Sequence, residues 1–233
     1  MRYRPDCRRH HQRLGLSEGP ARFNLRHRYS RPRSHPARPS ALTYHCPVAP
    51  SAIVSAIQAT GRDAILRGSG QPNSAAVAIL ETHAAGVADP VRGLARLVQV
   101  SPTATIVDLT VKGVAPGHYF ATLRENGDIS RGAASTGGVW AAPRGELGSL
   151  EVGESGVASA LLVRPTQVWE LLGRGFVLSK KQAAFATNDV DTLVGVVARS
   201  AGVWENEKTV CACSGKTVWE EREEQVGKGL PNL

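Results

Sequence analysis

The chain has 233 residues, of which 42% are hydrophobic, enough for one large domain or two modest ones. Its formal net charge of +8 resides in the first 47 residues, which hold 11 Arg and only two acids. Residues 48–233 hold 17 basic and 18 acidic residues, a net charge of −1. The body therefore carries no electrostatic footprint for a specific nucleic-acid partner.

Residues 1–47 are rich in Arg, Ser and Pro and have no hydrophobic periodicity, so we expect this leader to be disordered. Three interpretations stay open: an unstructured basic tail, a mitochondrial-type targeting segment, or sequence that is not native to the protein. No stretch of 18 apolar residues and no signal-peptide core is present, so we expect no membrane span and no secretion. The four cysteines lack a disulfide-framework spacing, which favours a reducing compartment.

A short helix is predicted from Pro50, because Ile53, Val54 and Ile57 follow at helical spacing and Gly61 stops the pattern. Asp63–Arg67 then reads as a strand, and Gly68–Gly70 as a turn or linker. About 20 residues of this kind cannot form a core alone. They either dock on the rest of the chain or end a domain whose first half is missing.

The stretch from Ala75 to Ala198 is β-type, with apolar and polar residues alternating at Val107, Leu109 and Val111. Turn signals at Gly and Pro separate the apolar runs. The pattern predicts a mainly β fold, a sandwich or Greek-key barrel of about 120 residues. Strands are predicted over Ala75–Leu80, Gly93–Val100, Val107–Lys112, Val157–Val163, Phe176–Leu178 and Thr192–Ala198.

Cys211 and Cys213 form a Cys-Ala-Cys near the end of the chain. In an extended backbone, residues two apart point to the same side, so both sulfurs can approach one ion. Soft thiolates select Cu(I). Zinc is not expected, because neither Cys7 nor Cys46 has the second nearby thiol from which a closed zinc site of four ligands is usually built. The alternative is that the two cysteines are incidental packing thiols.

The residues after this pair supply a reason for reactivity. Thr217 and Glu220 have the spacing of a capping box, which predicts a helix through Glu224. Its positive end, with Lys216 adjacent, would favour thiolate at Cys211 and Cys213. A disulfide between residues two apart closes a strained ring and is therefore oxidising.

The body of the chain resembles the copper chaperones for copper/zinc superoxide dismutase, in particular the fungal form. The resemblance covers residues 48 to 228, and its most specific stretch runs from Ala198 through the two cysteines to Arg222. The other matching stretches are Val48–Gly68, Pro72–Glu81, Gly127–Gly132 and Ser135–Gly137.

The resemblance implies a division into four parts. Residues 1–47 would be the leader, 48–70 a remnant of a ferredoxin-like heavy-metal-associated domain, 71–200 a superoxide dismutase-like Greek-key β-barrel, and 201–233 a short helical tail with the Cys-x-Cys. The family's amino-terminal Met-x-Cys-x-x-Cys copper loop has no counterpart here, since Cys7 lies among arginines and Cys46 stands alone.

The resemblance also implies a function. The barrel would dock an immature copper/zinc superoxide dismutase as a heterodimer, with a self-dimer as a second assembly. Cys211 and Cys213 would deliver Cu(I) and promote the client's disulfide by thiol-disulfide exchange. The alternative is a docking-only or regulatory protein that delivers no copper. The expected compartment is the cytoplasm, with the mitochondrial intermembrane space as a second one.

The resemblance predicts no dismutase activity, because the enzyme's metal ligands are replaced. Its two copper-binding histidines would fall on Thr122 and Arg124, its bridging histidine near Val139 and its last copper histidine near Ser179. The cysteines of its structural disulfide would fall near Ala133 and Val194. The barrel's only histidines, His83 and His118, are interpreted as surface or loop residues, and Gly127–Gly138 and Gly195–Gly202 as segments at or near the client.

Overall fold

The computed structural model describes residues 48–206 and 215–227, which belong to one compact unit starting at Val48. Its helices are α1 (Pro50–Gln58), α2 (Val168–Leu171) and α3 (Val218–Gly227). Its strands are β1 (Ala75–Thr82), β2 (Val91–Ser101), β3 (Ala104–Val111), β4 (Gly117–Leu123), β5 (Ser130–Ala133), β6 (Glu146–Val152), β7 (Ala158–Arg164), β8 (Gly175–Ser179), β9 (Leu193–Val196) and β10 (Ala198–Arg199).

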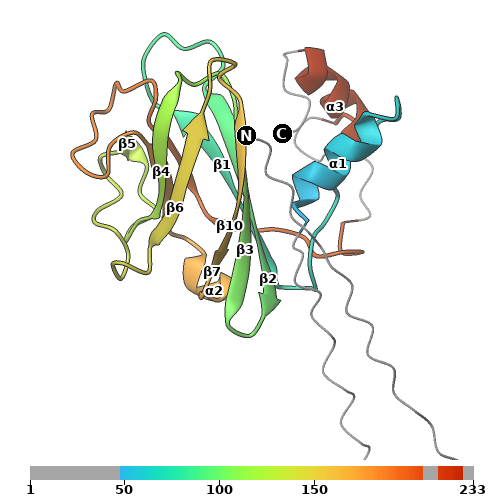
Figure 1. Ribbon diagram of the computed structural model, residues 1–233, viewed down its shortest axis with the longest axis horizontal. Coiled ribbons are helices and arrows are strands. Elements are labelled where there is room, and N and C mark those ends of the chain that lie inside the picture. The colour runs from blue at the N-terminus through green and yellow to red at the C-terminus, as the bar shows by residue number, and fades with distance from the viewer. Residues whose placement is uncertain (1–47, 207–214, 228–233) are drawn as a thin grey trace, which may run out of the picture. The chain divides into compact units, whose positions relative to one another are not determined.

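Eight strands form one antiparallel sheet in the order β6-β4-β8-β9-β1-β2-β3-β7, and β10 pairs with β1 (Figure 1). The pairs β1–β9, β4–β8 and β3–β7 join strands that are distant in sequence, as in Greek-key connections. The two end strands approach each other, since a Cβ on Gly148 of β6 would lie 2.7 Å from Nη2 of Arg164 on β7. The result is a nearly closed barrel, which confirms the predicted fold class.

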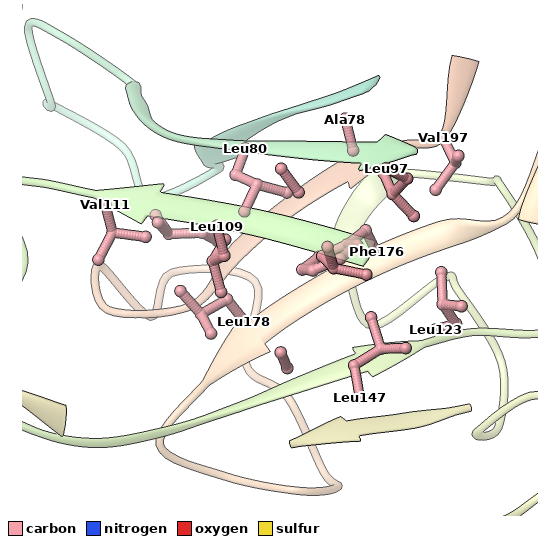
Figure 2. Packing of buried hydrophobic residues seen from close by; sticks show 14 of the residues in the cluster. Ala78, Leu80, Leu97, Leu109, Val111, Leu123, Leu147, Phe176, Leu178 and Val197 are labelled. Atoms are coloured by element: carbon pink, nitrogen blue, oxygen red, sulfur yellow. The ribbon is translucent and has the colours of Figure 1, made fainter. Parts of the chain in front are cut away.

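Leucine, valine and phenylalanine side chains from every face of the barrel fill its interior (Figure 2). On β3 the alternation predicted from the sequence holds, because Val107, Leu109 and Val111 are all fully buried. Phe176 and Leu178 of β8 enter the same cluster from the opposite wall. This packing gives the barrel a core of its own, to which α1 contributes no buried residue.

The predicted helix at Pro50 and all six predicted strands within Ala75–Ala198 are present. The strand predicted over Asp63–Arg67 is wrong, because this segment pairs with no strand in the part of the chain that the structure describes. Its backbone runs beside the barrel, and Asp63 accepts hydrogen bonds from Ala64 N at 2.8 Å and from Arg222. The sequence does not predict β4, β5 and β6, because their apolar alternation is short or broken by glycine and polar residues.

Asp108 on β3 is a buried carboxylate that joins α1 to the barrel. The alternation of β3 directs it away from the core, yet it is only 1% exposed because α1 covers it. Its oxygens accept hydrogen bonds from Ser51 N at 2.8 Å and Ser51 Oγ at 2.7 Å, within the first turn of α1. A carboxylate at the N-terminus of a helix also interacts favourably with the positive end of the helix dipole. Asp108 therefore caps α1 from a distant strand.

Gly195 on β9 is expected to tolerate no side chain. A Cβ there would lie 2.0 Å from the carbonyl oxygen of Ile79 on β1, so the two backbones would have to separate. We expect Gly195→Ala to lower the free energy of unfolding by about 3 kcal/mol, measured by urea denaturation. Gly153→Ala is the control, because a Cβ there meets no atom within 4 Å. Equal stability of the two variants would contradict this reading.

Candidate functional site

Cys211 and Cys213, the predicted metal and thiol-exchange residues, lie outside the described residues. The chain on either side of them is described, up to Asn206 and again from Gly215. The geometry of these two flanks therefore defines where the segment begins and ends.

The upstream flank continues directly from the barrel. β10 pairs with β1, and Ser200 N then donates to Ala75 O at 3.0 Å. Farther along, Ser69 N donates to Ala201 O at 3.2 Å and Val203 N donates to Gly70 O at 2.9 Å. The chain entering the cysteine segment is thus hydrogen-bonded first to β1 and then to the stretch before it.

A glycine is required where these two stretches meet. A Cβ on Gly68 would lie 2.2 Å from the carbonyl oxygen of Gly202, closer than any real Cβ contact. Gly202 N also donates to Glu205 Oε2 at 2.7 Å, which closes a turn just before the cysteine segment. The segment Gly68–Gly70, predicted as a turn or linker, therefore also makes close backbone contact with the chain at Gly202.

The downstream flank contains the predicted capping box. Thr217 N donates to Glu220 Oε2 at 2.7 Å, and Glu220 N donates to Thr217 Oγ1 at 3.2 Å. These reciprocal bonds satisfy two amides at the start of α3 and confirm the predicted helix. The backbone hydrogen bond from Thr217 lowers the pKa of Glu220, so this carboxyl stays ionised.

Carboxylates in the first turn of α3 weaken the positive potential that the sequence predicts at the start of this helix. Glu220 and Glu221 occupy the first turn of α3, where they offset the helix dipole. Lys216 pairs with Glu224, and the hydrogen bond between them raises the pKa of Lys216. Lys216 therefore remains a cation, but one whose charge is balanced by its partner.

The residues that the resemblance places at the enzyme's metal-ligand positions lie together in the structure. Thr122 and Arg124 are two positions apart at the end of β4 and therefore lie on the same face of the sheet. Arg124 also forms a β-bridge with Val139. Ser179 lies on β8, which pairs with β4, and its hydroxyl is 2.8 Å from that of Thr192. Arg124 is 5% exposed and donates to Gly137 O. None of the four side chains is a metal ligand of the enzyme's type.

The described residues contain no group of three or more His, Cys, Asp and Glu that could hold a metal ion. His83 follows the end of β1, with Nε2 3.4 Å from Glu81. His118 is exposed on β4 and its Nδ1 lies 2.9 Å from Glu151. These positions confirm the interpretation of both histidines as surface or loop residues.

The residues near which the resemblance places the enzyme's disulfide cysteines also meet. Ala133 of β5 and Val194 of β9 are both buried in one small cluster with Val177, and Ile129 and Phe185 pack against it. An apolar contact thus stands where the resemblance places a covalent bond. The stretch around β5 is held by packing and by hydrogen bonds such as Asn126 N to Thr136 O at 2.9 Å.

Comparison with known proteins shows a family to which the chain is similar over most of its length. No family model matches the chain. The superoxide dismutase 1 copper chaperone of Saccharomyces cerevisiae is 45% identical over 198 residues, covering 78% of this chain and 79% of that protein. The protein of the same name from Candida glabrata is 47% identical over 197 residues, covering 78% of each chain. The human copper chaperone for superoxide dismutase is 31% identical over 211 residues, covering 77% and 75%.

The chain belongs to the family of copper chaperones for superoxide dismutase. Membership confirms the resemblance seen in the sequence, and identity is higher to these fungal chaperones than to the human one. The relatives are named chaperones, which places the chain among metallochaperones rather than enzymes. The division of this chaperone into parts at residues 70 and 200 remains a prediction.

Sequence reasoning missed three residues that organise this chaperone. Asp63 and Arg222 are 159 positions apart and Asp108 is 57 positions from Ser51, so no local pattern connects them. Charge was the available signal, since Asp63 is the only acid between residues 48 and 80.

None of the described helices is long and apolar enough to cross a membrane.

Proposed function

We propose that this chain docks an immature copper/zinc superoxide dismutase through its barrel and delivers Cu(I) to it from Cys211 and Cys213. The observation that carries the proposal is that the chain enters the cysteine segment from β10, hydrogen-bonded to the barrel as far as Ser200 N and Ala75 O. Two soft thiols are thereby attached to a dismutase-like body. The names of the relatives, copper chaperones for superoxide dismutase, support the same cargo and client.

The barrel would act as a docking copy of the client. Dismutase-like subunits pair through two-fold interfaces, and a look-alike can occupy one half of such an interface. We place Gly127–Gly138 and Gly195–Gly202 at or near this contact. A self-dimer would use the same surface, so self-association and client binding would compete.

Two forms of the cysteine pair would do two jobs. In the reduced form, both thiolates hold Cu(I), and the ion passes to client ligands by exchange without change of oxidation state. In the oxidised form, a client thiolate attacks the Cys211–Cys213 disulfide and gives a mixed disulfide. A second client thiolate then releases the chaperone as a dithiol, so two electrons move from client to chaperone for each client disulfide formed.

The alternative is a docking-only or regulatory protein that binds the dismutase and delivers no copper. It differs from the main proposal in whether the tail binds Cu(I) at all, since docking needs only the barrel. We place the activity in the cytoplasm and, as a second compartment, in the mitochondrial intermembrane space. Zinc is not expected as cargo, because two ligands do not close a zinc site.

The test mixes Cu(I)-loaded chain with reduced, copper-free copper/zinc dismutase and follows enzyme activity and the client's copper content. We expect activity to rise with chaperone added, up to one copper per client subunit. A Cu(I) chelator present in excess removes copper that has left the chaperone, so only direct transfer is scored. Tight binding of the client without any activation would favour the docking-only alternative.

A further inference from the structure

The two flanks of the cysteine segment are fastened to one short stretch of chain, residues 63–70. The near flank is held by the hydrogen bonds of Ser69 and Gly70 to Ala201 and Val203, at 3.2 and 2.9 Å. The far flank is held by α3, where Arg222 contacts Asp63. Both flanks of the cysteine segment therefore contact residues 63–70.

The contact between Asp63 and Arg222 is a charge-assisted one. Arg222 donates from Nε at 3.1 Å and from Nη2 at 2.9 Å to Oδ1 of Asp63, which also accepts from Ala64 N at 2.8 Å. The hydrogen bond from Arg222 lowers the pKa of Asp63 and keeps it ionised. The carboxylate of Asp63 therefore stays negative at neutral pH, which strengthens its hydrogen bonds from the guanidinium.

The side chain of Arg222 is largely buried. Its side chain is 10% exposed, while that of Asp63 is 45% exposed. Its neighbours line a cavity of about 230 Å³ that includes Val54, Leu66 and Ala76. The arginine side chain thus borders a cavity that is also lined by apolar residues of α1 and β1, while its head meets the carboxylate.

The charge pattern makes this pairing specific. Arg222 is the only basic residue of α3, whose other charged residues are four glutamates. Asp63 is the only acidic residue between positions 48 and 80. Each charge therefore faces the one opposite charge that its partner's segment offers, and no neighbour in the same segment can replace it.

We infer that Asp63 and Arg222 are positioning residues for cargo transfer, which hold the far flank of the cysteine segment beside its near flank. The inference rests on the proposed role of Cys211 and Cys213. A segment tied at both ends samples a smaller volume than a tail tied at one end, so its thiols reach a docked client at higher effective concentration. Residues 63–70 would then serve transfer without binding copper themselves.

The test uses Asp63→Asn, which keeps an oxygen for Ala64 N but removes the charge that Arg222 needs. We expect the first-order rate of Cu(I) transfer within the saturated chaperone–client complex to fall about tenfold. The dissociation constant for the client and the affinity for Cu(I) should not change. Glu223→Gln is the matched control, because it removes one charge from an exposed site of α3.

Two further variants separate positioning from folding. Arg222→Gln should match Asp63→Asn, and the charge swap Asp63→Arg with Arg222→Asp should restore most of the rate. Hydrogen exchange of α3 amides should rise in both single variants and recover in the swap. Native transfer rates in single variants whose α3 exchanges faster would overturn the inference while leaving the proposed function intact. Native transfer by a chain without Cys211 and Cys213 would overturn both.

Discussion

The double variant Cys211→Ser, Cys213→Ser is expected to bind the reduced dismutase with native affinity and to leave it inactive. Serine has nearly the size of cysteine, but its hydroxyl neither ionises at neutral pH nor offers a soft ligand for Cu(I). It also cannot form a disulfide. We expect activation to fall to the level of the client without chaperone, which is a loss of more than about tenfold.

The measurement pairs two assays on the same samples. Client activity and client disulfide report delivery, and analytical ultracentrifugation reports docking. Single variants sharpen the result, because a chaperone with one thiol cannot form the Cys211–Cys213 disulfide that a client thiolate would attack. We expect Cys211→Ser and Cys213→Ser each to leave the client's disulfide unformed, with neither a client disulfide nor a mixed disulfide on a non-reducing gel. Native activation by the double variant would show that delivery does not use these residues.

Asp108→Ala is expected to destabilise the barrel more than the loss of a single hydrogen bond would. It would remove both acceptors of Ser51 and leave Arg96, whose Nη1 lies 4.0 Å from the Asp108 carboxylate, without that counter-charge. Burial lowers the pKa of Arg96 and Asp108 opposes this shift, so the guanidinium depends on its partner. Removing one member of a buried charge pair costs roughly 3–5 kcal/mol of unfolding free energy.

Two milder variants divide this loss into its parts. Ser51→Ala removes the side-chain contact from α1 but leaves Asp108 beside Arg96, so we expect a loss of about 1 kcal/mol. Asp108→Asn keeps shape and removes charge, and it should fall between the other two. Urea denaturation gives all three values. If Asp108→Ala costs no more than Ser51→Ala, the charge at position 108 has no structural role.

The barrel could be predicted from the sequence where strands are long and alternate cleanly. Val107, Leu109 and Val111 alternate with outward residues and lie in the core. β5 could not be found this way, because it has four residues and its core contact is made through Ala133 alone. Asp63–Arg67 carries strand-like residues but is paired with none of the described strands, since pairing depends on the rest of the fold.

The candidate site divides along the same line. The capping box of Thr217 and Glu220 is local, and the structure contains it as predicted. The contact of Arg222 with Asp63 joins residues 159 positions apart and only the fold brings them together. The resemblance predicts that Thr122 and Arg124 replace two of the enzyme's ligands, which stays a prediction, and the place of both residues on one face of the barrel required the structure. The roles of Cys211 and Cys213 stay predictions.

The pairing of β1 with β9 and β10 sets the order in which this protein can mature. Ala76 lies opposite Arg199 and Thr82 opposite Leu193. The first strand of the barrel therefore cannot complete its pairing until the last strands are present. On a ribosome, these contacts form only after nearly all of the barrel has been synthesised. The tail becomes attached to its platform in the same step. A completed chain whose barrel has misfolded would therefore lack the backbone contacts that lead into the cysteine segment, so exposure of these thiols would report unfinished folding.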